Sequence, residues 1–489
     1  MQVEEFVSYD GLGLAELVEK GEVAPTELLD LAIAQIQSTN DEVNAVVTPM
    51  WEQARDALAS NLPQGPFHGV PFLLKDLGQL YTGVVTSNGS RLFKDNVADH
   101  DSTLVQRYKA AGLVICGKTN TPEFGLATTT EPALHGPTHN PWNTKHSTGG
   151  SSGGAAAAVA AGYVPMAHAS DGGGSIRIPA SCCGLFGLKP TRGRVPLGPD
   201  ALEGWGGLST VHAVTRTVRD SAALLDCSAG EELGSPYAAP PPLRPYLEEV
   251  GHDPGKLRIG LCVESFTGAL VDPEVSSIAE QSANAIAALG HDSEIARPDI
   301  DTQAHTGAHG VLAISHIGAM LDAYAEKAGR PVTEQDVELV TWGNYQLAHA
   351  TTGASYAGAV GTIHQLGLIV ARYFERYDLL LTPTMACLPP KIGTLDMMND
   401  NAVAYIELLY RMIAFTALFN DTGHPAMSVP LGLSRSGLPV GVQLVASFGN
   451  EALLFRTAAQ LEQAGLFIPL TTLAQDAGSE SSSQTINKS

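Results

Sequence analysis

Two glycine-rich segments of the chain each carry a serine in a setting suited to carbonyl chemistry. They have the sequences STGGSSGG (147–154) and DGGGSIR (171–177). Glycine is useful where a backbone must lie close to a ligand. The N–H groups of Gly172, Gly173 and Gly174 could stabilise one developing negative oxygen, while Ser175 attacks the carbonyl carbon that bears it. These residues point to acyl transfer, and a tight structural turn is the alternative interpretation.

A serine nucleophile needs a base, and Lys75 is the candidate. This lysine ends the apolar run GVPFLLK (69–75), which is typical of a buried strand. Burial disfavours the charged ammonium group and lowers its pKa, so that a buried lysine can accept a proton. The alternative is an edge-strand lysine whose ammonium group reaches solvent.

Other chemistries have partial signals in the same region. Residues 149–153 match the GxSxG pattern of a nucleophile elbow around Ser151, and Asp378 and His424 would complete the triad. That motif follows a strand, whereas residues 141–146 are typical of a loop. Neither glycine-rich segment is followed by Gly-Lys-Ser/Thr, so a phosphate-binding P-loop is excluded.

Three histidines have helical spacing: His305, His309 and His316. They would share one face of a helix, but no Asp or Glu completes a metal-binding set. The alternatives to a metal site are lining of a substrate cleft and surface or capping roles, and we take His316 as a candidate for substrate binding. No metal is therefore expected.

Composition excludes several classes of partner. Lys and Arg number 28 against 51 Asp and Glu, which gives a net charge of −23. An acidic chain lacks the cations that bind nucleic-acid phosphates or anionic membranes. No apolar stretch is long enough to span a bilayer, and no signal peptide is visible. The six cysteines are scattered, as in a chain of reduced thiols, and we expect a cytoplasmic protein.

The elements that must position these residues alternate along the chain. Strands are predicted at 70–74, 113–116, 259–262 and 379–382, and helices at 102–111, 218–225 and 275–289. The alternation predicts an α/β protein with a largely buried mixed sheet. Further predictions are helices in the first ~60 residues, a hairpin from 426–433 and 438–445, an irregular excursion at 228–254 and a disordered tail at 475–489.

Seven motifs together resemble the amidase signature family. They are GVPFLLKD (69–76), GKTNTPE (117–123), GGSSGG (149–154), GGSIRIPAS (173–181), GLKPT (187–191), LTPT (381–384) and GHPAMSVP (423–430). Ser151 and Ser175 also lie 24 residues apart, as they do in the family. The likeness covers residues 5–465. It is greatest to the branch that contains 6-aminohexanoate cyclic dimer hydrolases and aryl acylamidases.

The resemblance implies a fold: a large mixed, mainly parallel sheet covered by helices on both faces, within one domain over 5–470. It also implies roles for single residues. Ser175 would be the nucleophile, Ser151 the proton relay after a cis peptide bond, and Lys75 the base. The backbone amides of 172–175 would form the oxyanion hole. Gly125 and Leu126 would lie in the acyl pocket, with core packing as the alternative. Gly172 departs from the family, which has a residue with a side chain there.

The function implied is that of a serine hydrolase that cleaves the C–N bond of small uncharged or hydrophobic amides, linear or cyclic. It would need no cofactor, and the family resemblance also suggests a homodimer. Two alternatives use the same residues: a carbamate or ester hydrolase, and the glutaminase subunit of a tRNA-dependent amidotransferase. A binding protein that lost catalysis is disfavoured because Lys75, Ser151 and Ser175 are all present.

Overall fold

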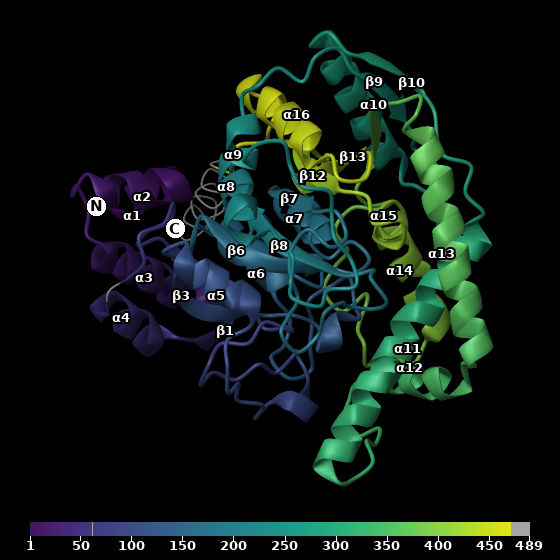
Figure 1. The fold of residues 1–489 in the computed structure, drawn as a ribbon, viewed down its shortest axis with the longest axis horizontal. Coiled ribbons are helices and arrows are strands. Elements are labelled where there is room, and N and C mark those ends of the chain that lie inside the picture. The colour runs from purple at the N-terminus through teal and green to yellow at the C-terminus, as the bar shows by residue number, and fades with distance from the viewer. Residues whose placement is uncertain (61, 471–489) are drawn as a thin grey trace, which may run out of the picture.

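An eleven-stranded sheet crosses the molecule (Figure 1). The computed structural model describes residues 1–60 and 62–470, so the predicted tail at 475–489 lies outside the described residues. In spatial order the strands are β1 (Val46–Pro49), β3 (Val114–Thr119), β2 (Pro71–Lys75), β6 (Met166–Asp171), β8 (Thr210–Thr215), β7 (Phe186–Lys189), β12 (Ala426–Leu433), β13 (Pro439–Ala446), β11 (Leu379–Pro383), β9 (Arg258–Leu261) and β10 (Asp292–Ile295). A separate small ribbon pairs β4 (His139–Asn140) with β5 (Asn143–Ser147).

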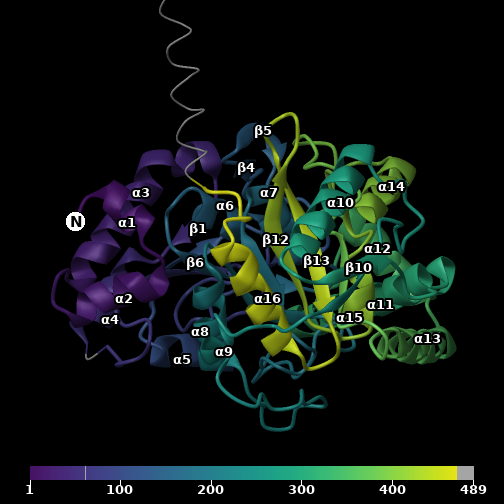
Figure 2. The ribbon, with the colours of Figure 1, turned by 90° about the horizontal axis from the view of Figure 1, so that it is seen from above.

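Helices surround this sheet, with the N-terminal helices at one end and α11 to α14 at the other (Figures 1 and 2). They are α1 (Val3–Ser8), α2 (Gly11–Glu19), α3 (Pro25–Val43), α4 (Trp51–Ala59), α5 (Thr103–Ala110), α6 (Gly153–Ala160), α7 (Arg177–Cys183), α8 (Val218–Ser228), α9 (Tyr246–Glu249), α10 (Pro273–Ala288), α11 (Thr302–Ala328), α12 (Leu339–Ala350), α13 (Gly353–Tyr373), α14 (Ala402–Met412), α15 (Ala417–Asp421) and α16 (Glu451–Gln463).

Both faces of the sheet are buried, as predicted. Side chains alternate along β2, so that Phe72 and Leu74 join one hydrophobic cluster and Leu73 joins another. The first cluster includes Leu224 of α8 and Phe455 of α16, and the second includes residues of α3, α6 and α7. A strand that is buried on both faces has a continuous apolar sequence, as β2 does before Lys75.

The predicted strands, helices and hairpin are all present, and the mixed sheet is confirmed. The expectation that its pairs are mainly parallel is corrected, because four of the ten neighbouring pairs are parallel and six are antiparallel. The reason is local. The strands β12 and β13, and likewise β7 and β8, follow each other without a crossover helix, and such strands return antiparallel.

The close packing of helix α6 explains why residues 155–160 have small side chains. Every residue of α6 is buried, and its first turn lies against the strand ends that hold the candidate site. A side chain at Gly154 would come within 2.4 Å of the backbone of Asn120 just after β3. Small residues therefore allow α6 to begin directly beside the ends of β2 and β6.

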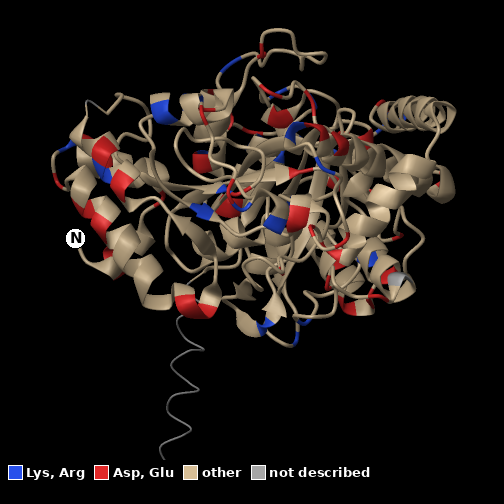
Figure 3. Ribbon diagram, turned by 90° about the horizontal axis from the view of Figure 1, so that it is seen from below, with Lys and Arg blue, Asp and Glu red and all other residues tan. Residues whose placement is uncertain are grey.

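The excursion at 228–254 begins where α8 ends and contains the short helix α9. A single domain over 5–470 stays a prediction. Figure 3 shows the acidic residues dispersed over many elements rather than gathered in one patch. In the described part of the chain, each helix is either too short or too polar to cross a bilayer.

Candidate active site

The predicted serines and lysine meet at the carboxyl ends of two neighbouring parallel strands. Lys75 is the last residue of β2 and Asp171 is the last residue of β6. Ser151 lies just before α6 and Ser175 just before α7. The carboxyl ends of parallel strands share one edge of a sheet, and ligand sites form there.

Lys75 is completely buried, and its Nζ atom contacts three hydroxyl groups. Nζ lies 2.6 Å from Oγ of Ser151, 3.0 Å from Oγ of Ser152 and 2.9 Å from Oγ of Ser170. Burial disfavours the ammonium form and lowers the pKa of Lys75 well below its usual value, although the carboxylate of Asp171 opposes this shift. A neutral amine at this position is the chemical state that the surroundings favour.

The hydrogen bonds of a neutral amine can be assigned in part. Such an amine donates two protons and accepts one, so one of the three hydroxyls must donate to it. The hydroxyl of Ser152 donates to the carbonyl oxygen of Ser170, so it accepts from Lys75. The proton that Nζ accepts therefore comes from Ser151 or Ser170, and Ser151 is the nearer of the two.

Two cavities meet at Ser175. One, of about 220 Å³, is lined by Ser151, Ser170, Gly172 and Ser175 together with residues of the segment 197–211. The other, of about 330 Å³, also reaches Ser175 and is lined largely by residues of α11, α12 and α14. Gly125, Ser175 and Trp205 border both cavities. A molecule held at Ser175 can therefore extend in two directions.

The glycine segment that precedes α7 presents free N–H groups. The N–H of Gly174 donates to Asp171 at 2.8 Å, so it is already engaged. Within the described residues, the N–H groups of Gly172, Gly173 and Ser175 have no hydrogen-bond partner. The peptide bond between Gly150 and Ser151 is cis, as the family resemblance implied.

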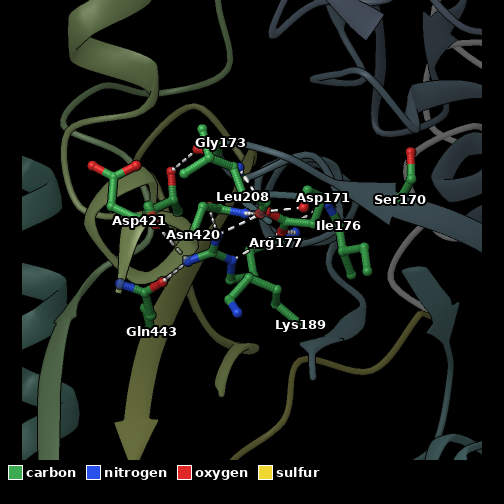
Figure 4. Close-up of polar contacts among 12 residues, drawn as sticks. Ser170, Asp171, Gly173, Ile176, Arg177, Lys189, Leu208, Asn420, Asp421 and Gln443 are labelled. Atoms are coloured by element: carbon green, nitrogen blue, oxygen red, sulfur yellow. Dashed lines mark hydrogen bonds and ion pairs between the residues drawn. The ribbon is translucent and has the colours of Figure 1, made fainter. Parts of the chain in front are cut away.

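A buried ion pair fixes this segment (Figure 4). The guanidinium of Arg177 contacts both carboxylate oxygens of Asp171, at 2.8 and 3.0 Å. It also donates to the carbonyl oxygen of Thr416 and to the side chains of Asn420 and Gln443. Burial alone would raise the pKa of Asp171, but Arg177 outweighs it and holds that pKa far below its usual value. The loop is thus tied to α15 and β13.

Trp205 occupies the space beside Gly172. A Cβ atom at Gly172 would lie 3.0 Å from two carbon atoms of the indole ring. The missing side chain therefore leaves no extra room for substrate, because Trp205 takes that room. No local signal indicates this pairing, since 33 residues of the sequence separate the two positions.

Of the remaining predicted residues, some line the two cavities and others do not. Gly125 borders both cavities, and Leu126 lines the larger one. His316 lies outside both linings and is hydrogen-bonded to the hydroxyl of Tyr356 at 3.0 Å. The other two spaced histidines, His305 and His309, do line the larger cavity. Across the described residues, no group of three His, Cys, Asp or Glu side chains is arranged to hold a metal ion.

Comparison with known proteins gives a consistent result. The family model for Amidase matches residues 27–455. A 6-aminohexanoate-cyclic-dimer hydrolase of Paenarthrobacter ureafaciens is 43% identical, with 93% of this chain and 94% of the relative covered. A solved 6-aminohexanoate cyclic dimer hydrolase has a TM-score of 0.90 at 42% identity, covering 95% of this chain and 98% of that one. A bacterial aryl acylamidase has a TM-score of 0.85 at 27% identity, with the same coverage.

Asp171→Asn should destabilise the protein strongly. The substitution keeps the shape of the side chain but leaves the buried guanidinium of Arg177 without its counter-charge. Such a change costs about 3–5 kcal/mol in free energy of unfolding, measurable by denaturant titration. The control is Asp336→Asn, which breaks a partly exposed pair with Arg330 and should cost less than about 1 kcal/mol. Equal costs for the two variants would contradict the structural role of Asp171.

Gly172→Ala should be destabilising only while Trp205 is present. The added methyl group overpacks the site against the indole ring, at a typical cost of about 1–3 kcal/mol. In a Trp205→Ala background the same substitution should cost less than about 0.5 kcal/mol, as expected of two residues in direct contact. Denaturant unfolding of the four proteins completes the cycle, with Gly361→Ala at an exposed position of α13 as the control. A cost independent of Trp205 would rule out the contact.

Proposed function

The chain belongs to the amidase signature family and is an amide hydrolase, and on that premise we propose that its acyl-enzyme forms on Ser175, with Ser151 and Lys75 transferring the proton. The substrates are small uncharged or hydrophobic amides, linear or cyclic. One observation carries the proposal: a buried lysine amine touches the hydroxyl of Ser151 at the wall of the cavity that also contains Ser175.

The first step is attack of the Ser175 hydroxyl oxygen on the amide carbon. Its proton passes to Oγ of Ser151, whose own proton passes to the neutral amine of Lys75. The contact of 2.6 Å between Ser151 and Lys75 is the second part of this relay. The burial that keeps Lys75 neutral is therefore what makes it a base.

The negative oxygen that develops needs donors that are already in place. The unpartnered N–H groups of Gly172, Gly173 and Ser175 are suited to this task, because they need not break another hydrogen bond to reach it. Gly174 contributes differently, since its N–H is held by Asp171. The Asp171–Arg177 pair would thus orient the oxyanion hole without entering it.

Collapse of the tetrahedral intermediate returns a proton through Ser151 to the departing amine and leaves an ester on Ser175. Water then attacks this ester, and the same relay accepts the proton of the water and returns it to Oγ of Ser175. The products are a carboxylic acid and an amine. The apolar walls of the larger cavity favour aliphatic or aromatic groups on the substrate.

Loss of the nucleophile should abolish turnover. Wild-type protein and Ser175→Ala are incubated with an anilide, a linear 6-aminohexanoate oligomer, an aryl carbamate and glutamine, and products are identified by mass spectrometry. We expect product from an amide, reduced at least about a thousandfold in Ser175→Ala, with exposed Ser436→Ala as the control. Turnover of glutamine alone would favour the amidotransferase subunit, and full activity in Ser175→Ala would exclude Ser175 as the nucleophile.

Activity should rise with pH, because only the neutral amine of Lys75 accepts a proton. The protein lowers the pKa of Lys75, so the rise in kcat/KM should have its midpoint below 10.5 and then level off. Lys75→Met should lose both the activity and the pH-dependent rise. Circular dichroism at each pH controls for unfolding. An activity that falls as the pH rises over this range would be incompatible with Lys75 as the base.

A further inference from the structure

Two histidines of α11 share one buried aspartate beside Ser175. Nδ1 of His305 lies 2.7 Å from one carboxylate oxygen of Asp421, and Nδ1 of His309 lies 2.8 Å from the other. Asp421 is fully buried, and His309 keeps 13% of its side chain accessible. Both histidines line the larger of the two cavities, as Ser175 and Gly173 do. The proposed proton relay uses neither of them.

The hydrogen bonds determine which nitrogen faces the cavity. Burial opposes ionisation of Asp421, but the two histidines lower its pKa below the usual value, so the carboxylate is ionised and only accepts. Each Nδ1 must therefore carry its proton, and each Nε2 is left for another partner. Nε2 of His309 lies 3.4 Å from the position that a Cβ atom would take at Gly173. Nε2 of His305 is buried without a partner among the described residues.

Two carboxylates favour the protonated form of His309. Burial opposes the imidazolium form, but the carboxylates of Asp421 and Asp171 outweigh it and raise the pKa of His309. An imidazolium has an N–H group at Nε2 as well as at Nδ1. Within the described residues no acceptor in the protein takes the Nε2 proton of His309. In its protonated form, His309 therefore has an unpartnered N–H group at a cavity that Ser175 also lines.

Much of the rest of that cavity is apolar, and its walls include Ala313, Ile314, Leu409, Ile413 and Ala417. The hydroxyl groups of two threonines in the lining are already used, because Thr128 donates to the sulfur of Met412 and Thr306 donates to the carbonyl oxygen of Thr302. The side chains of Asn344 and Tyr410 also line the cavity, on α12 and α14. A carbonyl oxygen buried here would lose its hydrogen bonds with water unless a protein donor replaced them, and Nε2 of His309 is the side-chain nitrogen beside Gly173.

We propose that His309, oriented by Asp421, donates a hydrogen bond from Nε2 to a second carbonyl oxygen of the substrate, beyond the amide that is cleaved. The inference rests on the proposed function and narrows its substrate class to molecules with two amides, cyclic or linear. His309 is then a specificity-determining residue, and Asp421 is a positioning residue that acts through it. His305 completes the pairing of the second carboxylate oxygen.

The test compares two rings of equal size. One is the cyclic dimer of 6-aminohexanoate, which has two amides, and the other is azacyclotetradecan-2-one, which has one. Ring opening is followed by mass spectrometry, and kcat/KM is measured for both compounds. In His309→Leu we expect a loss of about tenfold or more for the diamide and a much smaller loss for the single amide, as for one charge-assisted hydrogen bond.

Two further variants distinguish a role of His309 in substrate recognition from a purely structural role. His309→Gln keeps a side-chain N–H donor and should recover part of the preference for the diamide. His364→Leu, an exposed histidine on α13, should behave as wild type. A purely structural role for His309 would lower kcat/KM equally for both rings, and that result would overturn the inference. Hydrolysis of neither ring by wild-type protein would instead overturn the proposed substrate class.

If the wild-type protein opens only the diamide ring, the two rings are compared by binding instead of turnover. In a Ser175→Ala background, calorimetry gives the Kd of both rings with and without His309→Leu. We expect the Kd of the diamide to rise about tenfold in the double variant, while that of the single amide is little changed. An unchanged Kd for the diamide would contradict the hydrogen bond.

Discussion

The structure of the site depends on the buried ion pair between Asp171 and Arg177. Asp171 ends a central strand, and Arg177 begins the helix that follows the candidate nucleophile. Together they hold the glycine segment between them, because Asp171 also accepts from the N–H groups of Gly174 and Ile176. The same carboxylate raises the pKa of Lys75 against the larger effect of burial. Asn420 extends the arrangement to the neighbouring Asp421, which holds the two histidines of α11. This one ion pair thus connects the candidate base Lys75, the candidate oxyanion donors and the wall of the larger cavity.

Burial of a lysine is costly, and the surroundings of Lys75 reduce that cost in a chemically useful way. Its amine is satisfied by three hydroxyl groups rather than by a carboxylate in direct contact. A direct carboxylate contact would have favoured the ammonium form. The contrast with Lys118 is instructive, since that buried lysine lies 3.5 Å from Asp76. Lys118 also contacts the hydroxyl of Thr86, and burial lowers its pKa, but the carboxylate of Asp76 opposes that shift at close range. Lys75 contacts hydroxyl groups alone, which is the setting better suited to accepting a proton.

Much of the fold and site could be predicted from sequence because the signals are local. The run 69–75 has the composition of a strand buried on both faces, and the glycine-serine segments are unusual in any setting. Contacts between distant positions have no such signal. The place of Trp205 against Gly172 depends on how the segment 197–211 folds back, and the partner of His309 is 112 residues away at Asp421. Helical spacing groups His316 with His309, but His316 contacts Tyr356 of α13, while its neighbour Ile317 lines the smaller cavity. The mainly parallel sheet that the family resemblance implied is also corrected, since strands that follow each other without a crossover helix, such as β12 and β13, return antiparallel.

The two cavities that meet at Ser175 are built from largely different residues. The segment 197–211 forms much of one wall, and α12 and α14 line only the other cavity, whereas α11 lines both. Gly125, Ser175 and Trp205 are the residues common to both linings. Substitutions in separate, non-contacting regions generally have additive effects. Proteins that evolve from such a protein can therefore gain specificity for a new group on one side of the scissile bond while keeping their specificity on the other side. Divergence of substrate range within this architecture does not require the reacting residues to change.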